Sequence, residues 1–273
     1  GGSGGNFCTP QIGGVRMTSS EKIMAMSQEE VLNLALTAGR ILLISGGETY
    51  RVEETIMRLC AWREMSYVKV FVTPTVIIIG DERAHGYTCM TRVTSRTTNL
   101  ALVSAINDMS YNFGQWPYTY QETKNILEAM LQEPVPSPYL ISIASGVGAA
   151  AFAVMLGGNR YDFAAAFVTG FITMLVLKRL AGFRPSAFWE NSLAGIIVGV
   201  LALGCCQLLP AATMEKVIVG AIMPFLPGVA FTNGLRDYMA GDLLSGNSRV
   251  AEALLFAAAL AIGLGVVLRI WLN

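Results

Sequence analysis

Five apolar segments in the second half of the sequence constrain the fold more than any other feature. They cover about residues 139 to 156, 161 to 180, 187 to 209, 214 to 238 and 249 to 272. Each approaches the ~20 residues that a helix needs to cross a hydrocarbon layer about 30 Å thick. Only 14% of the whole chain is charged and 53% is hydrophobic, whereas soluble domains are about 25% charged. The sequence therefore predicts an α-helical integral membrane protein with about five transmembrane helices.

The first half reads as a separate α+β domain over residues 21–133, with charges every few residues. Helical spacing of apolar residues is found at 28–45, 48–64, 98–112 and 119–131, and β-rich runs at 67–72, 76–79 and 87–93. We expect Ser27 to cap the first helix, Gly46-Gly47 to end it, and Asp81-Glu82-Arg83 to form the turn between the last two strands. The domain should contain a small antiparallel sheet.

Two segments of biased composition frame this domain. Residues 1–20 begin with Gly1-Gly2-Ser3-Gly4-Gly5 and read as a disordered start or linker. Residues 134–138 are rich in proline and predict a semi-rigid linker before a transmembrane domain at 139–273. No signal peptide is expected, because the start lacks an apolar stretch.

Charge and cysteine content exclude several classes of function. The 19 basic and 19 acidic residues balance, and no run of Lys or Arg offers a surface for nucleic acid. The five cysteines lack metal-ligand spacing, so we expect neither a metal site, a cofactor nor a disulfide framework. His85, the only histidine, is interpreted as a solvated loop residue; its pairing with Cys89 as a nucleophile is the less favoured alternative.

Basic residues at the helix ends predict the orientation. Lys178, Arg179 and Arg184 cluster between the second and third apolar segments. Because positively charged loops stay in the cytoplasm, this cluster predicts a cytoplasmic N-terminal domain and places Asn273 outside.

The fourth apolar segment carries the strongest local signal. Pro224, Pro227 and Gly228 interrupt its helix, and transporters use such breaks to bind ions and anionic groups. Asn233, Arg236 and Asp237 follow the break, so we interpret the segment as part of a substrate path. The alternative is a kinked helix that serves packing alone.

Other polar residues in or beside the apolar segments are further candidates for proton or substrate coupling: Glu190, Asn191, Asp242 and Glu252. Each also has a structural interpretation. Glu190 suits a surface position, Asp242 and Asp162 suit helix caps, and Glu252 suits a pair with Arg249 three residues earlier. Gly195 and Gly199 form a G-x-x-x-G pattern that would let a neighbouring helix approach closely.

An ordered set of short motifs then identifies a family. The set comprises residues 46–53, Thr73-Pro74-Thr75, Arg92-Val93, Arg96, Asn99-Leu100, Pro224 to Gly228, Asn233, Arg236-Asp237, Gly241-Asp242, Ser245-Gly246 and Arg249 to Glu252. Over about residues 28 to 260 the chain resembles the threonine/serine exporter N-terminal family. The resemblance implies export of a carboxylate-bearing solute, either threonine and serine or a dicarboxylate such as succinate, across the bacterial inner membrane.

Single-chain members of that family have about ten spans, and split members have about five and act with a second small membrane subunit. The resemblance therefore implies a two-component exporter driven by an ion gradient, which can also oligomerise. Its substrate is a small anionic or zwitterionic molecule. Two other classes stay open: a membrane-tethered hydrolase that uses Cys89 or Ser45, and a membrane scaffold or sensor.

Overall fold

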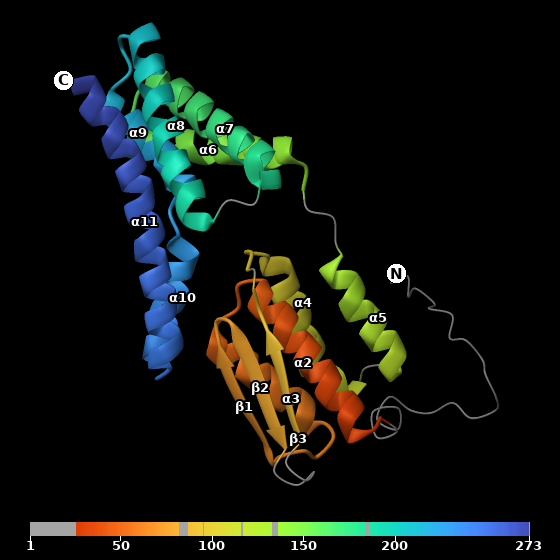
Figure 1. Cartoon of the computed structure of the whole chain (residues 1–273). Helices are drawn as coiled ribbons and strands as arrows, with labels where there is room; N and C mark the ends of the chain where they lie inside the picture. Colours follow the sequence, from red (N-terminus) through yellow and green to blue (C-terminus); the bar gives the residue numbers. More distant parts are fainter. Residues whose placement is uncertain are drawn as a thin grey trace, which may run out of the picture. The chain divides into compact units, whose positions relative to one another are not determined.

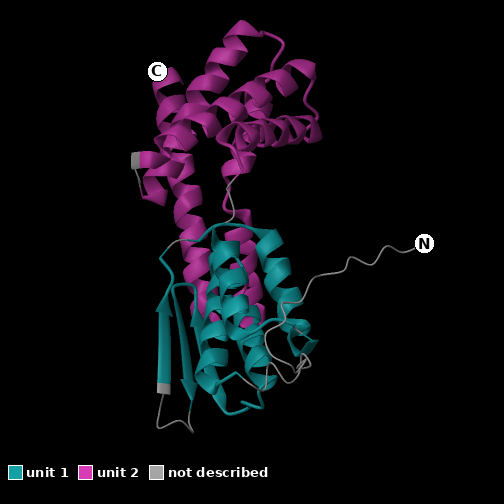
Figure 2. Ribbon diagram, turned by 90° about the vertical axis from the view of Figure 1, so that its right-hand side faces the viewer, with its two compact units in different colours: residues 1–47, 51–132 teal, residues 48–50, 133–273 magenta. Residues whose placement is uncertain are grey.

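The chain folds into two compact units, which Figure 2 colours separately. The computed structural model describes residues 26–81, 87–94, 96–115, 117–132, 136–183 and 186–272. Unit 1 comprises residues 1–47 and 51–132, and unit 2 comprises residues 48–50 and 133–273. Several predictions concern residues outside the described ranges: the start at 1–20, Glu82 and Arg83 of the turn, His85, Pro134 and Val135 of the linker, Arg184 and Asn273.

Unit 1 combines helices with a three-stranded sheet (Figure 1). Its elements are α2 (Gln28–Ile44), α3 (Thr49–Ala61), β1 (Val68–Thr73), β2 (Val76–Asp81), β3 (Tyr87–Arg92), α4 (Leu100–Tyr111), η1 (Phe113–Gln115) and α5 (Tyr120–Leu131). The first two residues of α3 belong to unit 2. The strands are antiparallel in the order β1-β2-β3. The predicted antiparallel sheet is therefore confirmed. The prediction that Asp81 lies in a turn is wrong. Asp81 is a buried residue at the end of β2.

Helix α2 lies at the centre of unit 1 and is capped at both ends. Ser27 and Glu30 form a reciprocal capping box at its N-terminus, as the sequence predicts for Ser27. At its C-terminus Gly46 has a φ of +89°, which favours glycine. The amides of Gly46 and Gly47 donate to Leu43 and Leu42, so the helix ends in a Schellman turn. This turn sets where residues 48–50 begin.

Alternate sheet residues and the apolar sides of α2 and α3 form one core in unit 1, which includes Ile77, Ile79 and Cys60. Burial raises the pKa of the Cys60 thiol to about 12, and the carboxylate of Asp81 adds to this effect. The thiol stays protonated at neutral pH and is a packing residue, since the thiolate is the nucleophilic form.

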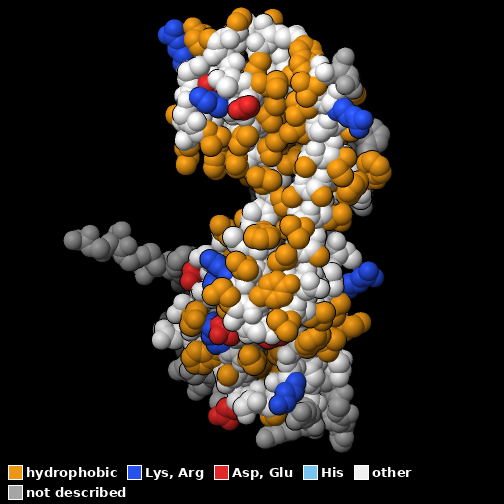
Figure 3. Space-filling model, turned by 90° about the vertical axis from the view of Figure 1, so that its left-hand side faces the viewer, with side chains coloured by type: hydrophobic (Ala, Val, Ile, Leu, Met, Phe, Trp, Pro, Cys, Tyr) orange, Lys and Arg blue, Asp and Glu red, His pale blue; other side chains and the backbone are white. Residues whose placement is uncertain are grey.

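Unit 2 is helical. Its elements are α6 (Pro138–Met155), α7 (Arg160–Leu180), η2 (Ala181–Phe183), α8 (Ala187–Leu208), α9 (Met214–Ile222), η3 (Met223–Phe225), α10 (Gly228–Met239) and α11 (Leu243–Leu272). Helices α6, α7, α8 and α11 are long and apolar enough to span a membrane, and α9–η3 with α10 forms a further candidate bent by 59°. Hydrophobic side chains cover much of the bundle surface in Figure 3, as contact with lipid requires. The predicted helical membrane fold is confirmed.

Helices α8 and α11 run parallel and touch through glycines. A side chain at Gly195 would overlap the carbonyl oxygen of Leu260, and one at Gly263 would overlap that of Ser192. Small residues allow such close helix contacts in membranes. The predicted close approach at Gly195 and Gly199 is thus confirmed, and the neighbouring helix belongs to the same chain.

The parallel direction of α8 and α11 decides how the bent pair is connected. Since both helices start at the same end of unit 2, the chain between them must travel back along the bundle. The segment α9–η3–α10 makes this return. It therefore runs from one end of the bundle to the other, and we call it the bent crossing.

Polar groups join two loops at the other end of the bundle. Asn159 and Asp162 form a capping box at the start of α7. Asp162 also accepts a hydrogen bond from the Thr213 amide before α9. Asp162 is therefore a helix cap, as one of the two sequence interpretations proposed.

The glycine contact yields a stability prediction. Gly195→Ala and Gly263→Ala should each destabilise the chain by about 1–3 kcal/mol, because the new methyl group overpacks the contact between α8 and α11. Gly204→Ala and Gly265→Ala are matched controls on the same two helices, since a methyl group there meets open space. Thermal denaturation of purified variants in detergent measures the difference, and equal melting temperatures for all four variants would contradict the packing.

Candidate functional site

The break in the bent crossing lies near the middle of the bundle. Helix α9 ends at Ile222, and the 3-10 turn η3 and Leu226 separate it from α10. Pro224 lies beside Gly148, which is near the middle of α6. Pro227 occupies the N-cap position of α10 and Gly228 is its first residue. The prolines and Gly228 thus lie at the point where the helix is interrupted.

Helices α10 and α11 form a tight antiparallel hairpin. Gly241 connects them with a φ of +89°, and the Asp242 carboxylate accepts a hydrogen bond from the Ser245 amide to cap α11. Gly234 and Gly246 lie in the contact: a side chain at Gly246 would press on the ring of Tyr238 and the backbone of Gly234. The two helix backbones therefore come close enough for short polar side chains to meet.

An ion pair is buried inside this hairpin. Nε of Arg249 lies 3.1 Å from Oδ2 of Asp237, and the two side chains are 5% and 0% exposed. Because removing one partner leaves an uncompensated buried charge, such a pair must stay intact or exchange its partner for another charge. Asp237 thus pairs across the hairpin with Arg249 and not with its sequence neighbour Arg236.

Residues 48–50, which belong to unit 2, complete the polar cluster. The Thr49 amide donates to Oδ1 of Asp237 at 3.2 Å, and the Thr49 hydroxyl donates to Oδ2 of Asp242 at 3.0 Å. Oε1 of Glu48 lies 2.6 Å from Nη1 of Arg236. The Glu48 side chain is 7% exposed, whereas that of Arg236 is 61% exposed. One face of the Arg236 guanidinium therefore binds a carboxylate while another remains accessible.

Contacts between α8 and α11 show how far along the bundle axis this cluster lies from the start of α8. Gly263 lies level with Ser192 to Ile196, so Ala187 lies level with about residue 256 if both helices rise equally. Helix α11 therefore extends about 13 residues, or roughly 20 Å, past the start of α8. Helix α10 packs along this extension.

Basic residues mark the same end of unit 2. Lys178 and Arg179 lie in the last turn of α7, and Arg179 donates to the hydroxyl of Tyr139 in the first turn of α6. The starts of α6 and α8, the end of α7 and the hairpin thus share one end.

The other candidate residues take no part in the hydrogen bonds and ion pairs described above. Glu190 is exposed in the first turn of α8, and Asn191 donates to the carbonyl of Ala187 in its own helix. Asn233 is buried in α10, and Glu252 is half-buried one turn after Arg249. Among the described residues no group of three or more His, Cys, Asp or Glu side chains is arranged to hold a metal ion.

Sequence reasoning missed Glu48 and Thr49 as site residues. The sequence pattern placed them only at the start of the helical segment 48–64. Their partners lie 188 to 193 positions away in the chain, and local spacing carries no information on contacts of that range.

Four long apolar helices, one bent crossing and a buried charge cluster define a multi-pass membrane protein. The model of the ThrE family of threonine/serine exporters matches residues 33–271. The chain belongs to this threonine/serine exporter family.

Two curated relatives are similar over most of the chain. The chain is 21% identical over 262 residues to the "Probable threonine/serine exporter" of Mycobacterium tuberculosis, and the aligned region covers 94% of the chain and 49% of that protein. It is 24% identical over 245 residues to the "Threonine/serine exporter" of Corynebacterium glutamicum, which covers 86% of the chain and 50% of that protein. The chain therefore spans about half the length of these relatives. No solved structure matches it.

The buried ion pair makes a testable prediction. Asp237→Asn and Arg249→Met should each cost about 3–5 kcal/mol of stability, because each leaves one buried charge without its partner. The double variant should cost less than the sum of both. Arg269→Met is the control, since Arg269 is exposed near the end of the same helix. Chemical denaturation of the purified chain measures the four values, and additive small effects would show that the pair does not couple α10 to α11.

Proposed function

We propose that the chain is a subunit of a bacterial inner-membrane exporter for small carboxylate-bearing solutes. The observation that carries this proposal is the Arg236 guanidinium, which binds the Glu48 carboxylate and remains largely exposed. Threonine, serine and succinate all present a carboxylate. The names of the two relatives specify threonine and serine, which supports this class of substrate.

Arg236 is the proposed binding residue because a planar guanidinium fork matches a carboxylate. The contact with Glu48 demonstrates the same chemistry inside the chain. A solute carboxylate that reaches Arg236 would replace Glu48 or bind beside it. The break at Pro224, Pro227 and Gly228 forms the adjoining part of the path, since an interrupted helix presents free backbone groups.

Asp237 is the proposed coupling residue. It is buried and accepts a hydrogen bond from the Thr49 amide, and the Thr49 hydroxyl donates to Asp242. Protonation of Asp237 would release Arg249 from its partner and loosen the hairpin. A carboxylate that alternates between an ion pair and a protonated form can link export to a proton gradient.

We further propose that the N-terminal domain is cytoplasmic and that a second small membrane subunit completes the exporter. Lys178 and Arg179 share the hairpin end with Arg236 and Arg249, which favours the cytoplasm for that end. The relatives carry about as much sequence again outside the matched region, and the proposal assigns that part to the second subunit.

Reconstituted vesicles test the function directly. Vesicles that contain this chain and its small subunit should export threonine or succinate down an imposed gradient, and vesicles with either protein alone should not. Transport by this chain alone would contradict the two-subunit proposal. Failure of the assembled pair to transport any small carboxylate would contradict the exporter proposal.

Variants of Arg236 and Asp237 test the residue roles. Arg236→Lys keeps the charge but loses the fork, so export should fall about 10-fold or more while membrane insertion stays normal. Asp237→Asn also lowers stability, so its export is compared per amount of folded protein, and on that basis its pH dependence should flatten. Arg160→Lys is the matched control, because Arg160 is exposed at the start of α7 and donates to Tyr161. If both site variants export at the parental rate at every pH, the proposed roles of Arg236 and Asp237 are wrong, and Glu190 and Asn191 become the candidates.

A further inference from the structure

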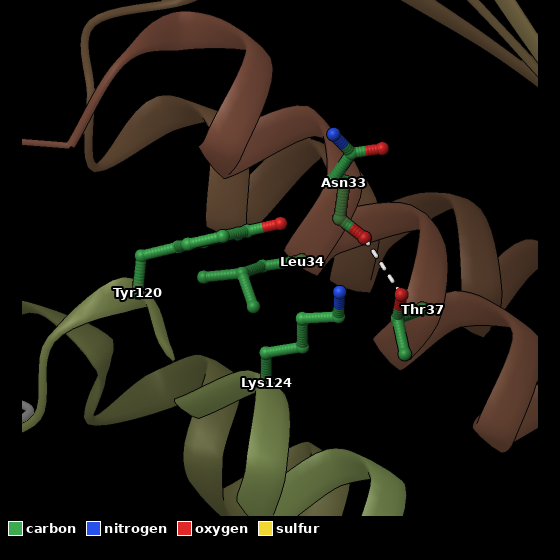
Figure 4. A pocket seen from close by; sticks show the side chains of 5 residues that line it. All are labelled: Asn33, Leu34, Thr37, Tyr120 and Lys124. Atoms are coloured by element: carbon green, nitrogen blue, oxygen red, sulfur yellow. Dashed lines mark hydrogen bonds between the residues drawn. The ribbon is translucent and has the colours of Figure 1, made fainter. Parts of the chain in front are cut away.

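A pocket in unit 1 lies apart from the residues of the proposed transport path. Its volume is about 290 Å³, and it is lined by Asn33, Leu34 and Thr37 of α2 and by Tyr120 and Lys124 of α5. Figure 4 shows the Lys124 ammonium and the Tyr120 ring extending from α5 toward α2. Leu34 is buried and forms the apolar part of the lining. This volume suits a ligand of few heavy atoms, because sites for drug-sized ligands begin near 300 Å³.

Polar groups with unused bonding capacity surround this space. The Thr37 hydroxyl donates to the Asn33 carbonyl and keeps its acceptor sites. Within the part of the chain that the structure describes, no residue hydrogen-bonds to the Asn33 carboxamide or the Tyr120 hydroxyl. Lys124 has only a loose contact to Glu128, at 3.9 Å and between half-exposed side chains. Such an exposed pair contributes little free energy and exchanges readily for another anion.

The charges of the lining residues indicate what the pocket accepts. Lys124 supplies one positive charge, and the other four lining residues are neutral. A carboxylate can accept hydrogen bonds from the ammonium and the phenol together. A ligand ammonium would instead meet Lys124 with no acidic side chain among the lining residues. We propose that this pocket binds a small carboxylate anion.

Residue-resolved acetylation of Lys124 tests the site in the full chain. A sulfosuccinimidyl acetate ester is added with sodium succinate or sodium acetate, and modification is read by mass spectrometry. Bound carboxylate should slow acetylation of Lys124 several-fold. Lys69 on β1 is the internal reference, because it is exposed and lies outside the pocket lining, and its rate should not change. Sodium chloride at equal ionic strength should protect neither lysine.

A variant of the lining adds a second test. Tyr120→Phe should reduce the protection by succinate, and Asn125→Ala should not, since Asn125 bonds to Gln121 on α5 outside the pocket. Unchanged acetylation of Lys124 at saturating succinate, or equal protection by chloride or by uncharged acetamide, would overturn the proposal. The Arg236→Lys variant should retain the protection, so failure of this site and failure of the transport site give different results.

Discussion

The glycine contact between α8 and α11 is the constraint on which the second unit depends. Backbones meet at Gly195 and Gly263 with no room for a side chain, and this contact fixes both the parallel direction and the relative level of the two helices. The direction requires α9–η3–α10 to return across the bundle. The relative level makes about the first 13 residues of α11 extend past the start of α8. The position of the charge cluster follows from a packing contact that carries no charge.

The hairpin of α10 and α11 explains how a chain with an apolar bundle can also bury charged side chains. A 30-residue helix is about 45 Å long, which exceeds a hydrocarbon layer by roughly 15 Å. Its polar first third can therefore lie at the aqueous boundary while the apolar remainder spans the layer. Asp237 and Arg249 need no position at the bilayer centre, where each charge would cost about 2.5–3.5 kcal/mol. The break beside Pro224 connects this boundary region with the middle of the bundle.

Sequence patterns predicted the features that depend on neighbouring residues, namely the apolar helices, the ends of α2 and the helix break. Apolar length identified the spans, and Ser27 and Gly46-Gly47 identified the ends of α2. Proline and glycine located the break in the fourth crossing. Local patterns could not predict that Asp237 pairs with Arg249, because i,i+1 residues on a helix diverge and the partner lies in another helix. They also could not bring Glu48 to Arg236. Asp81 was assigned to a turn from its polarity, although it ends a buried strand.

Accessibility of the hairpin tests the central claim most directly. Ser248 is exposed on the extension of α11, and Ala257 lies in its apolar part. In a cysteine-free background, single cysteines at these positions are treated with a membrane-impermeant maleimide in spheroplasts and in inside-out vesicles. We predict that Ser248→Cys reacts only in inside-out vesicles and that Ala257→Cys reacts in neither. Labelling of Ser248→Cys from the outside, or its protection on both sides, would contradict a polar hairpin at the cytoplasmic boundary.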